Sequence, residues 1–400
     1  MKILQLTNKP PWPARDGGAI AILNLTKGFS LHGHDVTVLA MNTGKHHINP
    51  EEIPDEINRF ATFRFVDVTA DTSYPEALLN LVFSSEPYTA VRFVSKTFKR
   101  ALIQILKDNI FDIIQLEGSY LLPYIPDIRK RSKALIALRA HNIESEIWER
   151  TATASKGFKK WYLKNLASRI RKFEGKWMNR YDLLVTITDR DGDQLNKLGN
   201  NRPLQVTQSG MDFSLIQSSS REVEFPSLFH IGSLDWMPNQ EGITWFLENC
   251  WDKIKSKHPA LNFYVAGRNA PEWLIHRLKK PGVIFLGEVE NAAAFEQSKA
   301  IMVVPLFSGS GMRVKIVEGM ALGKAIVSTS IGAEGLQVTD SENIMIANHP
   351  DDFIWKIELL LGNEPYFIQM GEKANKFARE NFDHTILAGE LLNFYQRQMK

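Results

Sequence analysis

Short apolar runs recur along the chain, and longer stretches with a helical spacing of apolar residues separate them. Runs such as LLVTI (183–187) and IMVVP (301–305) lack regular polar alternation, which is typical of strands covered on both faces. Helices between such strands imply parallel βαβ crossovers, so we predict an α/β protein with doubly wound sheets. The predicted strands cover residues 2–7, 35–40, 59–66, 111–116, 133–140 and 182–188, and then 228–232, 261–267, 283–287, 300–305, 325–330 and 343–347.

Twelve strands are more than one sheet usually holds, so we expect two sheets in two domains. The best break lies at residues 203–226, which are polar and poor in strand-forming residues. The predicted domains therefore cover residues 1–207 and 208–379. Two Rossmann-like domains of this kind would face each other across a cleft, and ligands of open α/β sheets bind beyond the carboxyl ends of the strands.

Composition excludes several classes of protein. The 400 residues are 44% apolar and 23% charged, which is the balance of a globular protein. The single cysteine excludes a disulfide framework and a thiolate metal cluster. The net charge of +3 is too small to indicate nucleic-acid binding, and no apolar run approaches the roughly 20 residues of a membrane span. We expect a cytoplasmic protein.

The strongest local signal lies between the strand at 300–305 and the helix after it. Gly309 and Gly311 allow a ligand to approach the backbone closely, and the N-terminus of the helix favours an anion. Arg313 and Lys315 add two positive charges, and Glu318 shares a helix face with Lys315. This set suits a diphosphate with a ribose diol beside it. An ordinary strand–helix turn with solvated charges is the alternative.

Two loops of the first domain are weaker candidates. Asp16, Gly17 and Gly18 follow the first strand and begin a helix, where the backbone can approach a phosphate or an acceptor. A plain glycine turn explains them equally well. His141 follows the strand at 133–140 and is placed to reach a cleft, although a lone histidine after a strand is more often structural.

Asp189, Asp191 and Asp193 form an Asp-x-Asp-x-Asp pattern, and metal-dependent sugar transferases of another fold use an Asp-x-Asp pair. A calcium-binding loop would need glycine and glutamate where Gln194 and Asn200 stand. Capping of the following helix by Asp189 explains the cluster more simply. We therefore predict no metal site and no cofactor.

The segment between Lys156 and Arg180 holds nine Lys or Arg residues and one acidic residue, Glu174. Its apolar residues recur at spacings of three and four, so we predict one amphipathic basic helix. We expect its aromatic side chains, Phe158 and Trp161 among them, to be buried. Its basic face is a candidate contact with an anionic membrane surface.

Taken in order, these motifs resemble the retaining GT-B glycosyltransferases of family 4, the "group 1" type. The resemblance covers essentially the whole chain and rests on five stretches. They are the loop and helix 309–323 with the strand 325–329, residues 16–18, the His141 loop, QSGMD (208–212), which looks like the Pro-x-Gly-Val-Asp linker of the family, and GSLDWMPN (232–239), which matches a subgroup with Trp-x-Pro-Asn.

The resemblance implies a nucleotide-sugar donor held by the C-terminal domain, an acceptor bound by the N-terminal domain, retention of configuration and no metal. It also implies that the last helix crosses back, so residues 380–400 are assigned to the N-terminal domain. Glu318 matches the glutamate that usually holds the ribose hydroxyls, and His141 matches the histidine near the donor sugar. Gly17 and Gly18 match the loop on the phosphate and acceptor side.

The chain departs from the family pattern at three places. Ser310 stands where a donor-sugar glutamate is usual, and Ser233 stands where a diphosphate-binding arginine is usual. The usual lysine is absent from residues 239–241. We predict that Arg313 and Lys315 supply the two missing charges.

The resemblance implies a retaining glycosyltransferase that passes a sugar from a nucleotide-sugar donor to a glycan or lipid-linked acceptor, in cell-surface polysaccharide synthesis. A GT-B-type nucleotide-sugar epimerase or hydrolase, and a catalytically silent nucleotide-sugar-binding protein, remain alternatives. The predicted catalytic residues are His141, Arg313 and Lys315; the donor-binding residues are Gly232, Ser310, Gly311, Met312 and Glu318; and the acceptor or phosphate loop is Asp16, Gly17 and Gly18.

Overall fold

The chain forms two compact α/β units. The computed structural model describes residues 1–14, 16–71, 73–153, 155–216, 223–309 and 311–399. Unit 1 comprises Met1–Gly210 with His384–Lys400, and unit 2 comprises Met211–Asp383. The predicted boundaries at 207 and 379 lie a few residues before these divisions.

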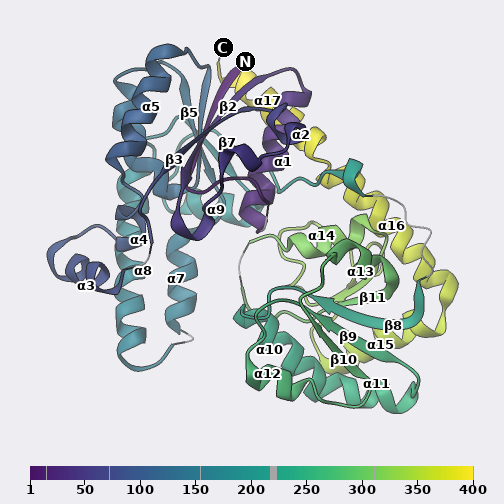
Figure 1. Ribbon diagram of the computed structural model, residues 1–400. Coiled ribbons are helices and arrows are strands. Elements are labelled where there is room, and N and C mark those ends of the chain that lie inside the picture. Colours follow the sequence, from purple (N-terminus) through teal and green to yellow (C-terminus); the bar gives the residue numbers. More distant parts are fainter. Residues whose placement is uncertain (15, 72, 154, 217–222, 310, 400) are drawn as a thin grey trace. The chain divides into compact units, whose positions relative to one another are not determined.

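Unit 1 is built on a seven-stranded parallel sheet of order β3-β2-β1-β4-β5-β6-β7 (Figure 1). Its central strands are buried on both faces, which explains their continuous apolar sequences. The strands are β1 (Lys2–Thr7), β2 (Asp35–Asn42), β3 (Thr62–Asp67), β4 (Ile113–Glu117), β5 (Leu135–Ala140), β6 (Leu183–Thr186) and β7 (Leu204–Val206). The helices are α1 (Gly17–Leu31), α2 (Asp55–Asn58), α3 (Tyr74–Phe83), α4 (Tyr88–Val91), α5 (Lys96–Asp108), α6 (Ile125–Arg129), α7 (Glu144–Thr153), α8 (Gly157–Trp177), α9 (Asp189–Lys197) and α17 (His384–Gln398).

Unit 2 is built on a six-stranded parallel sheet of order β10-β9-β8-β11-β12-β13. The strands are β8 (Glu224–Ile231), β9 (Asn262–Ala266), β10 (Val283–Gly287), β11 (Lys299–Val304), β12 (Ala325–Ser328) and β13 (Met345–Ile346). The helices are α10 (Met237–Phe246), α11 (Asp252–Lys257), α12 (Glu272–Arg277), α13 (Ala292–Ser298), α14 (Val314–Ala321), α15 (Pro350–Gly362) and α16 (Glu364–Phe382). Two parallel sheets with crossover helices confirm the predicted fold class.

Each of the twelve predicted strands coincides with a strand, and the differences lie at the ends and at the domain boundary. The stretch that we predicted to be a strand-poor linker contains β7 and the first residues of β8. β7 has three residues and pairs only with β6 at the edge of the sheet. An edge strand of this length buries too little apolar surface to leave a clear sequence pattern.

Side-chain caps begin several helices at the residue after a strand or loop. Asp16 accepts a hydrogen bond from the Ala19 amide and caps α1, the helix that we predicted to begin after the first strand. In α9 the cap is Thr188, whose hydroxyl accepts from the Asp191 amide. The expectation that Asp189 caps this helix was therefore wrong. Asp189 is its first helical residue, where a carboxylate interacts favourably with the helix dipole.

The predicted basic helix corresponds to α8, but its aromatic residues are not all buried. Phe173 lies in the core, whereas Phe158 is 73% exposed and Trp161 is 54% exposed. The expectation of a fully buried aromatic stripe was therefore wrong for the first turns of α8. The N-terminal part of α8 packs chiefly on α7, which ends at Thr153 and covers only one side of it.

The last helix, α17, returns to unit 1 and packs along α1, as the resemblance implied. Gly28 in α1 makes this close packing possible. A Cβ atom at position 28 would lie 2.4 Å from the Ala388 Cβ and 2.7 Å from the His384 carbonyl oxygen. Neither distance is sterically allowed, so glycine sets the separation of the two helices.

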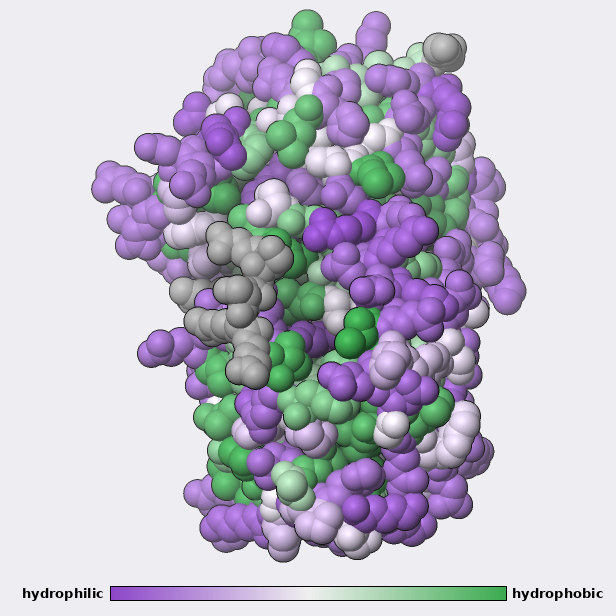
Figure 2. All heavy atoms as spheres, turned by 90° about the vertical axis from the view of Figure 1, so that its right-hand side faces the viewer, coloured by the Kyte–Doolittle hydropathy of each residue, from purple (hydrophilic) through white to green (hydrophobic). Residues whose placement is uncertain are grey.

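Hydrophilic side chains outnumber hydrophobic ones on the face that Figure 2 shows. Among the described residues, no helix combines the length and the apolar character that crossing a bilayer requires.

We expect Gly28→Ala to destabilise the protein by about 1–3 kcal/mol, because the added methyl group overpacks the contact between α1 and α17. Gly175→Ala in α8 is the matched control. No neighbouring atom lies within 4 Å of its added Cβ, so alanine should stabilise the helix by roughly 0.5–1 kcal/mol. Urea unfolding of both variants measures the two changes. Equal changes of the same sign would contradict the packing argument.

Candidate functional site

The strand order of unit 2 places β8 between β9 and β11. The chain leaves β8 toward one side of the sheet and returns to its other side at β11, so β8 stands at the topological switch point. Ligands of open α/β sheets bind beyond the carboxyl ends of strands at this point. The loops after β8, β9 and β11 are therefore the candidate site of unit 2.

Lys315, in the first turn of α14, reaches from the β11 side to the end of β8. Its Nζ donates a hydrogen bond to Asn239 Oδ1 at 2.7 Å and lies 3.3 Å from the Ile231 carbonyl oxygen. It also lies 3.3 Å from His230 Nε2. Burial and the charge of Arg313 lower the pKa of Lys315 to about 7. An anion that approached the ammonium group would restore its charge.

His230 is buried in β8 and stays neutral, because burial and the Lys315 charge lower its pKa well below the usual value. Its Nδ1 lies 2.8 Å from the Val303 carbonyl oxygen, which fixes the proton on Nδ1. Nε2 is then an acceptor and faces the Lys315 ammonium group. The sequence analysis missed His230 because nothing in an apolar strand marks one histidine as a partner of a distant lysine.

Arg313 precedes α14 and is buried. One of its nitrogens donates to the Gly311 carbonyl oxygen, and its guanidinium lies over the Trp236 ring, 5.5 Å from the centroid. Gly309 has a φ of 109°, and a Cβ there would lie 2.9 Å from Arg313 Nη2. Glycine at 309 is therefore needed both for the backbone conformation and for the position of Arg313.

Of the other predicted donor residues, Gly232 and Met312 lie in the loops after β8 and β11. Gly232 ends β8, and a Cβ there would lie 3.2 Å from Lys315 Nζ. Met312 is partly buried beside Arg313. Ser310 lies outside the described residues. Burial raises the pKa of Glu318 on α14, and burial together with the Glu318 charge raises the pKa of Glu296 well above its usual value.

Arg268 is a cation that the sequence analysis missed. It follows Gly267 at the end of β9, and its Nε lies 3.4 Å from Ser233 Oγ. Ser233 in turn donates to Asp235 at 2.6 Å, and this bond is the first cause of a lowered pKa for Asp235. The exposed guanidinium thus stands beside Ser233, where the resemblance led us to expect an arginine. An arginine directly after a strand and a glycine is the sequence signal that could have revealed it.

In unit 1, the loop after β1 positions Asp16, Gly17 and Gly18. Lys9 Nζ binds Asp16 Oδ1 at 2.5 Å. Burial would raise the pKa of Asp16, but the charge and hydrogen bond of Lys9 lower it below its usual value. A Cβ at Gly18 would lie 3.0 Å from Lys9 Nζ, so Gly18 leaves room for this ion pair. Lys9 was not among the predicted site residues.

His141 follows β5, and its Nε2 lies 2.6 Å from Glu117 Oε2 at the end of β4. Arg139 Nη1 reaches the same oxygen at 3.3 Å. Burial would raise the pKa of Glu117, but Arg139 and His141 lower it below its usual value. Burial also lowers the pKa of His141 despite Glu117, so the imidazole is neutral at pH 7 and donates from Nε2.

A buried polar chain continues from Glu117 across the sheet. Gln115 donates its amide to Glu117, and Tyr395 on the returning helix α17 donates to Gln115 Oε1 at 2.6 Å. Thr26 on α1 donates to Gln5 Oε1 at 2.6 Å, and Gln5 lies on β1 beside Gln115. The carboxylate at the sheet end is thus held by residues far apart in the sequence.

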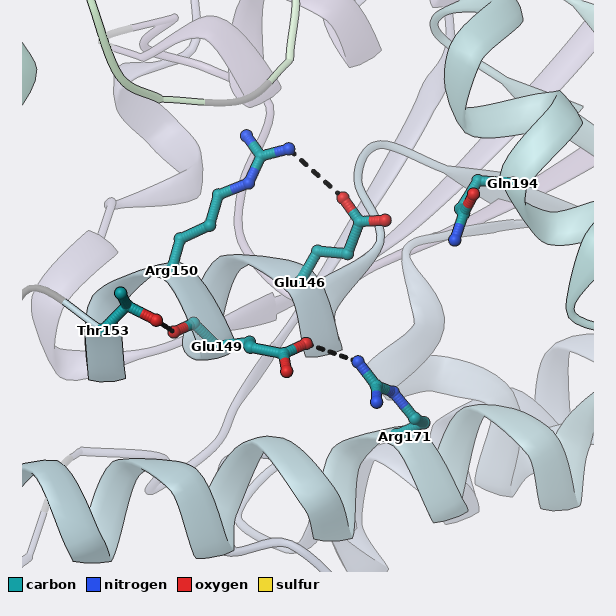
Figure 3. A pocket seen from close by; sticks show the side chains of 6 residues that line it. All are labelled: Glu146, Glu149, Arg150, Thr153, Arg171 and Gln194. Carbon is teal, nitrogen blue, oxygen red and sulfur yellow. Dashed lines mark hydrogen bonds and ion pairs between the residues drawn. The ribbon is translucent and has the colours of Figure 1, made fainter.

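A hollow of about 550 Å³ lies among α7, α8 and α9 (Figure 3). Glu146 pairs with Arg150, and Glu149 pairs with Arg171, so its two carboxylates and two guanidinium groups compensate each other. The nearby Asp191 pairs with Arg190. Among the described residues, no three His, Cys, Asp or Glu side chains converge as metal ligands would.

Comparison with known families identifies the family of this chain. A model described as Glycosyltransferase Family 4 matches residues 15–215, half of the chain, and one described as Glycosyl transferases group 1 matches residues 225–363. The chain belongs to glycosyltransferase family 4. The two matches together cover the loops after β5, β8 and β11 in this glycosyltransferase.

Individual relatives extend the likeness over the full glycosyltransferase chain. An uncharacterized 44.6 kDa protein in the cps region of Klebsiella pneumoniae is 24% identical over 399 residues, 96% of each chain. HepE from Anabaena, solved in complex with UDP, has a TM-score of 0.69 at 13% identity and covers 99% of this chain and 100% of its own. Sucrose-phosphate synthase from Thermosynechococcus elongatus has a TM-score of 0.73 at 14% identity and covers 99% of both chains. These structural likenesses establish the GT-B fold.

We expect Glu117→Gln to destabilise this glycosyltransferase by about 3–5 kcal/mol, because it leaves the Arg139 charge buried without its counter-ion. The folded pKa of Glu117 is depressed, so its stabilisation is complete above the unfolded pKa and is lost as the pH falls through the folded value. The difference between wild type and variant should therefore shrink on acidification. Urea unfolding from pH 7 down to pH 3 or below tests this, and a difference that stays constant over the whole range would contradict it.

Proposed function

We propose that the protein is a retaining, metal-independent glycosyltransferase that moves a sugar from a nucleotide-sugar donor to a glycan or lipid-linked acceptor. Family membership supports the enzyme class, and the HepE structures with UDP and with UDP-glucose support a nucleotide-sugar donor. The observation that carries the proposal is the ammonium group of Lys315 at the end of β8. The relative in a cps region favours a role in cell-surface polysaccharide synthesis.

A glycosyl transfer needs the leaving diphosphate to gain negative charge at low cost. Fixed cations and backbone N–H groups provide this without reorganisation at the moment of reaction. In unit 2 the Lys315 ammonium, the Arg313 guanidinium and the N-terminus of α14 would provide it. Burial and the charge of Arg313 lower the pKa of Lys315 to about 7, so the charged form costs more in the empty site, and a bound diphosphate would favour it.

Two contacts bear on the prediction that Arg313 and Lys315 supply the two charges missing from the family pattern. The first supports the prediction for Lys315, and the second favours Arg268 in place of Arg313. Lys315 binds Asn239, which belongs to the stretch where the family lysine is missing. Arg268 lies beside Ser233, which occupies the position of the family arginine. Arg313 packs under Trp236 instead. We therefore assign the two diphosphate contacts to Lys315 and Arg268, with Arg313 as a further charge behind the loop.

The remaining predicted residues would act around the donor sugar and the acceptor. Glu318 would hold the ribose hydroxyls, and neutral His141 would orient the sugar or stabilise positive charge near it. Gly17 and Gly18 would line the acceptor side. The bond from the anomeric carbon to the diphosphate breaks, the acceptor oxygen bonds to the same face, and its proton passes to the leaving phosphate.

Product analysis separates this proposal from its two alternatives. Incubation with nucleotide sugars and candidate acceptors, followed by NMR, should show a new glycoside of retained configuration. Turnover without an acceptor would establish an epimerase or hydrolase, and tight binding without any turnover would establish a silent binding protein. A thermal-shift screen with UDP-, GDP-, ADP- and CMP-sugars identifies the donor for this test, because a bound ligand raises the melting temperature.

We expect Lys315→Met to lower kcat/KM at least about 100-fold, because it removes one charge that stabilises the transition state. Lys324→Met is the matched control. Lys324 is a buried lysine of the same unit, but its Nζ binds the carbonyl oxygens of Gln297 and Lys299. The Lys324→Met variant should be less stable than the wild type, while its folded fraction keeps the wild-type activity. Steady-state kinetics on folded protein checks both, and near-normal activity of Lys315→Met would contradict the assignment.

The affinity for UDP should fall as the pH rises above about 7, because the empty site then has to take up a proton to charge Lys315. The limiting slope is roughly tenfold per pH unit. Isothermal titration calorimetry between pH 7 and 9 measures it, and buffers of different ionisation enthalpy reveal the proton. Lys315→Met should show no such slope. A slope unchanged in this variant would assign the proton to another group.

A further inference from the structure

One face of α3 is apolar and has no covering element among the described residues. Leu78, Leu79, Val82 and Phe83 fall on this face at spacings of one, four and five residues. Each is more than half exposed, and Phe83 is 82% exposed. Figure 1 shows α3 standing out from unit 1 beside α8. Four large apolar side chains on one face are unusual for a surface helix.

The first half of α8 adds two exposed aromatic residues and several lysines. Phe158 and Trp161 point outward, as described above. Lys159, Lys164 and Lys172 are exposed, and none of them forms an ion pair with a described residue. The other charges of this helix are partly engaged, since Arg171 pairs with Glu149 and Lys176 pairs with Glu86.

Arg169 joins α3 and α8 into one face. Its guanidinium donates to the carbonyl oxygens of Asn80, at 3.2 Å, and Leu81, at 2.6 Å. Phe158 lies three helical turns before Arg169 and so projects from the same side of α8. Trp161 lies about 80° round the helix from Arg169, toward solvent. The apolar side chains of α3 and the aromatic side chains of α8 therefore belong to one region of unit 1.

We propose that this region docks on the surface of an anionic lipid bilayer. We call it the α3–α8 face, and define it by Leu78, Leu79, Val82, Phe83, Phe158 and Trp161. The exposed Lys159 and Lys164 flank it on the two sides of α8, about 80° and 140° round the helix from Arg169, and Lys172 lies between them. The apolar and aromatic side chains enter the interface between headgroups and acyl chains, and the lysines meet the anionic headgroups.

The charge of this region favours an anionic bilayer over a second copy of the chain as its partner. The segment from Lys156 to Arg180 holds nine basic residues and one acidic residue, and that acid, Glu174, is buried. Two such faces would repel each other, whereas anionic headgroups attract each of the unpaired lysines. Aromatic residues next to lysines also suit the amphipathic interface of a bilayer better than a dry protein contact. The inference does not depend on the identity of the sugar donor.

A fluorophore at position 83 tests the docking directly in the full chain. Cys250 is the only cysteine and is buried, and burial raises the pKa of its thiol to about 12, so Phe83→Cys can be labelled selectively with an environment-sensitive dye. Ile110→Cys is the matched control, because Ile110 is 89% exposed on the same unit but lies outside the face. Vesicles of phosphatidylglycerol and phosphatidylcholine should shift the emission to the blue at 83 and not at 110. Raising the salt from 50 to 500 mM should reverse the shift.

Charge variants measure the electrostatic part of the binding by vesicle co-sedimentation. Lys159→Gln, Lys164→Gln and Lys172→Gln together should weaken binding on the order of 100-fold, at about 1 kcal/mol for each lysine. Lys96→Gln, Lys107→Gln and Lys130→Gln together remove the same charge from other exposed positions of unit 1 and should weaken it far less.

Four results would overturn the proposal. They are no shift at position 83 with any vesicle, an equal shift with phosphatidylcholine alone, equal losses for the two triple variants, and a shift that grows with protein concentration in the absence of vesicles. The last result would identify a second copy of the chain as the partner of the α3–α8 face.

Discussion

A lysine ammonium group held at the carboxyl end of a parallel sheet is the interaction on which the rest of unit 2 depends. Burial disfavours the charge of Lys315, and its hydrogen-bond partners among the described residues are the neutral groups of Asn239, His230 and a backbone carbonyl. The site therefore keeps a cation whose charge is incompletely compensated inside the protein. A site of this kind favours the binding of an anion, and the glycine residues of the neighbouring loops leave room for it.

In unit 1 the charged group held at the carboxyl ends of the strands is negative instead of positive. There a carboxylate, Glu117, is buried, and Arg139 compensates it within the protein. His141 is consequently held by a fixed negative partner, and burial keeps its imidazole neutral despite that partner. The two units share one architecture, but one presents an uncompensated cation and the other an oriented imidazole. This difference follows from which residues end the strands and not from the fold.

Unit 1 has a further feature on its surface, on α3 and the first turns of α8. A helix that packs on a domain normally buries its apolar stripe and leaves its charges in water. The last turns of α8 follow this rule through Phe173, whereas its first turns and α3 leave aromatic and aliphatic side chains exposed among lysines. This combination of exposed apolar and basic side chains is what the proposed docking on an anionic bilayer requires.

The sequence by itself determined the class of fold, because apolar runs without alternation and the helical stretches between them permit only parallel, doubly covered sheets. It also determined the loop from Gly309 to Lys315, because glycines, cations and a helix start stand next to one another in the chain. The partners of that loop came only from the tertiary structure. Asn239 and His230 reach Lys315 from 76 and 85 residues away, and Arg268 meets Ser233 across 35 residues. Local sequence carries no signal for such pairs, because the register of neighbouring strands sets which loop ends meet.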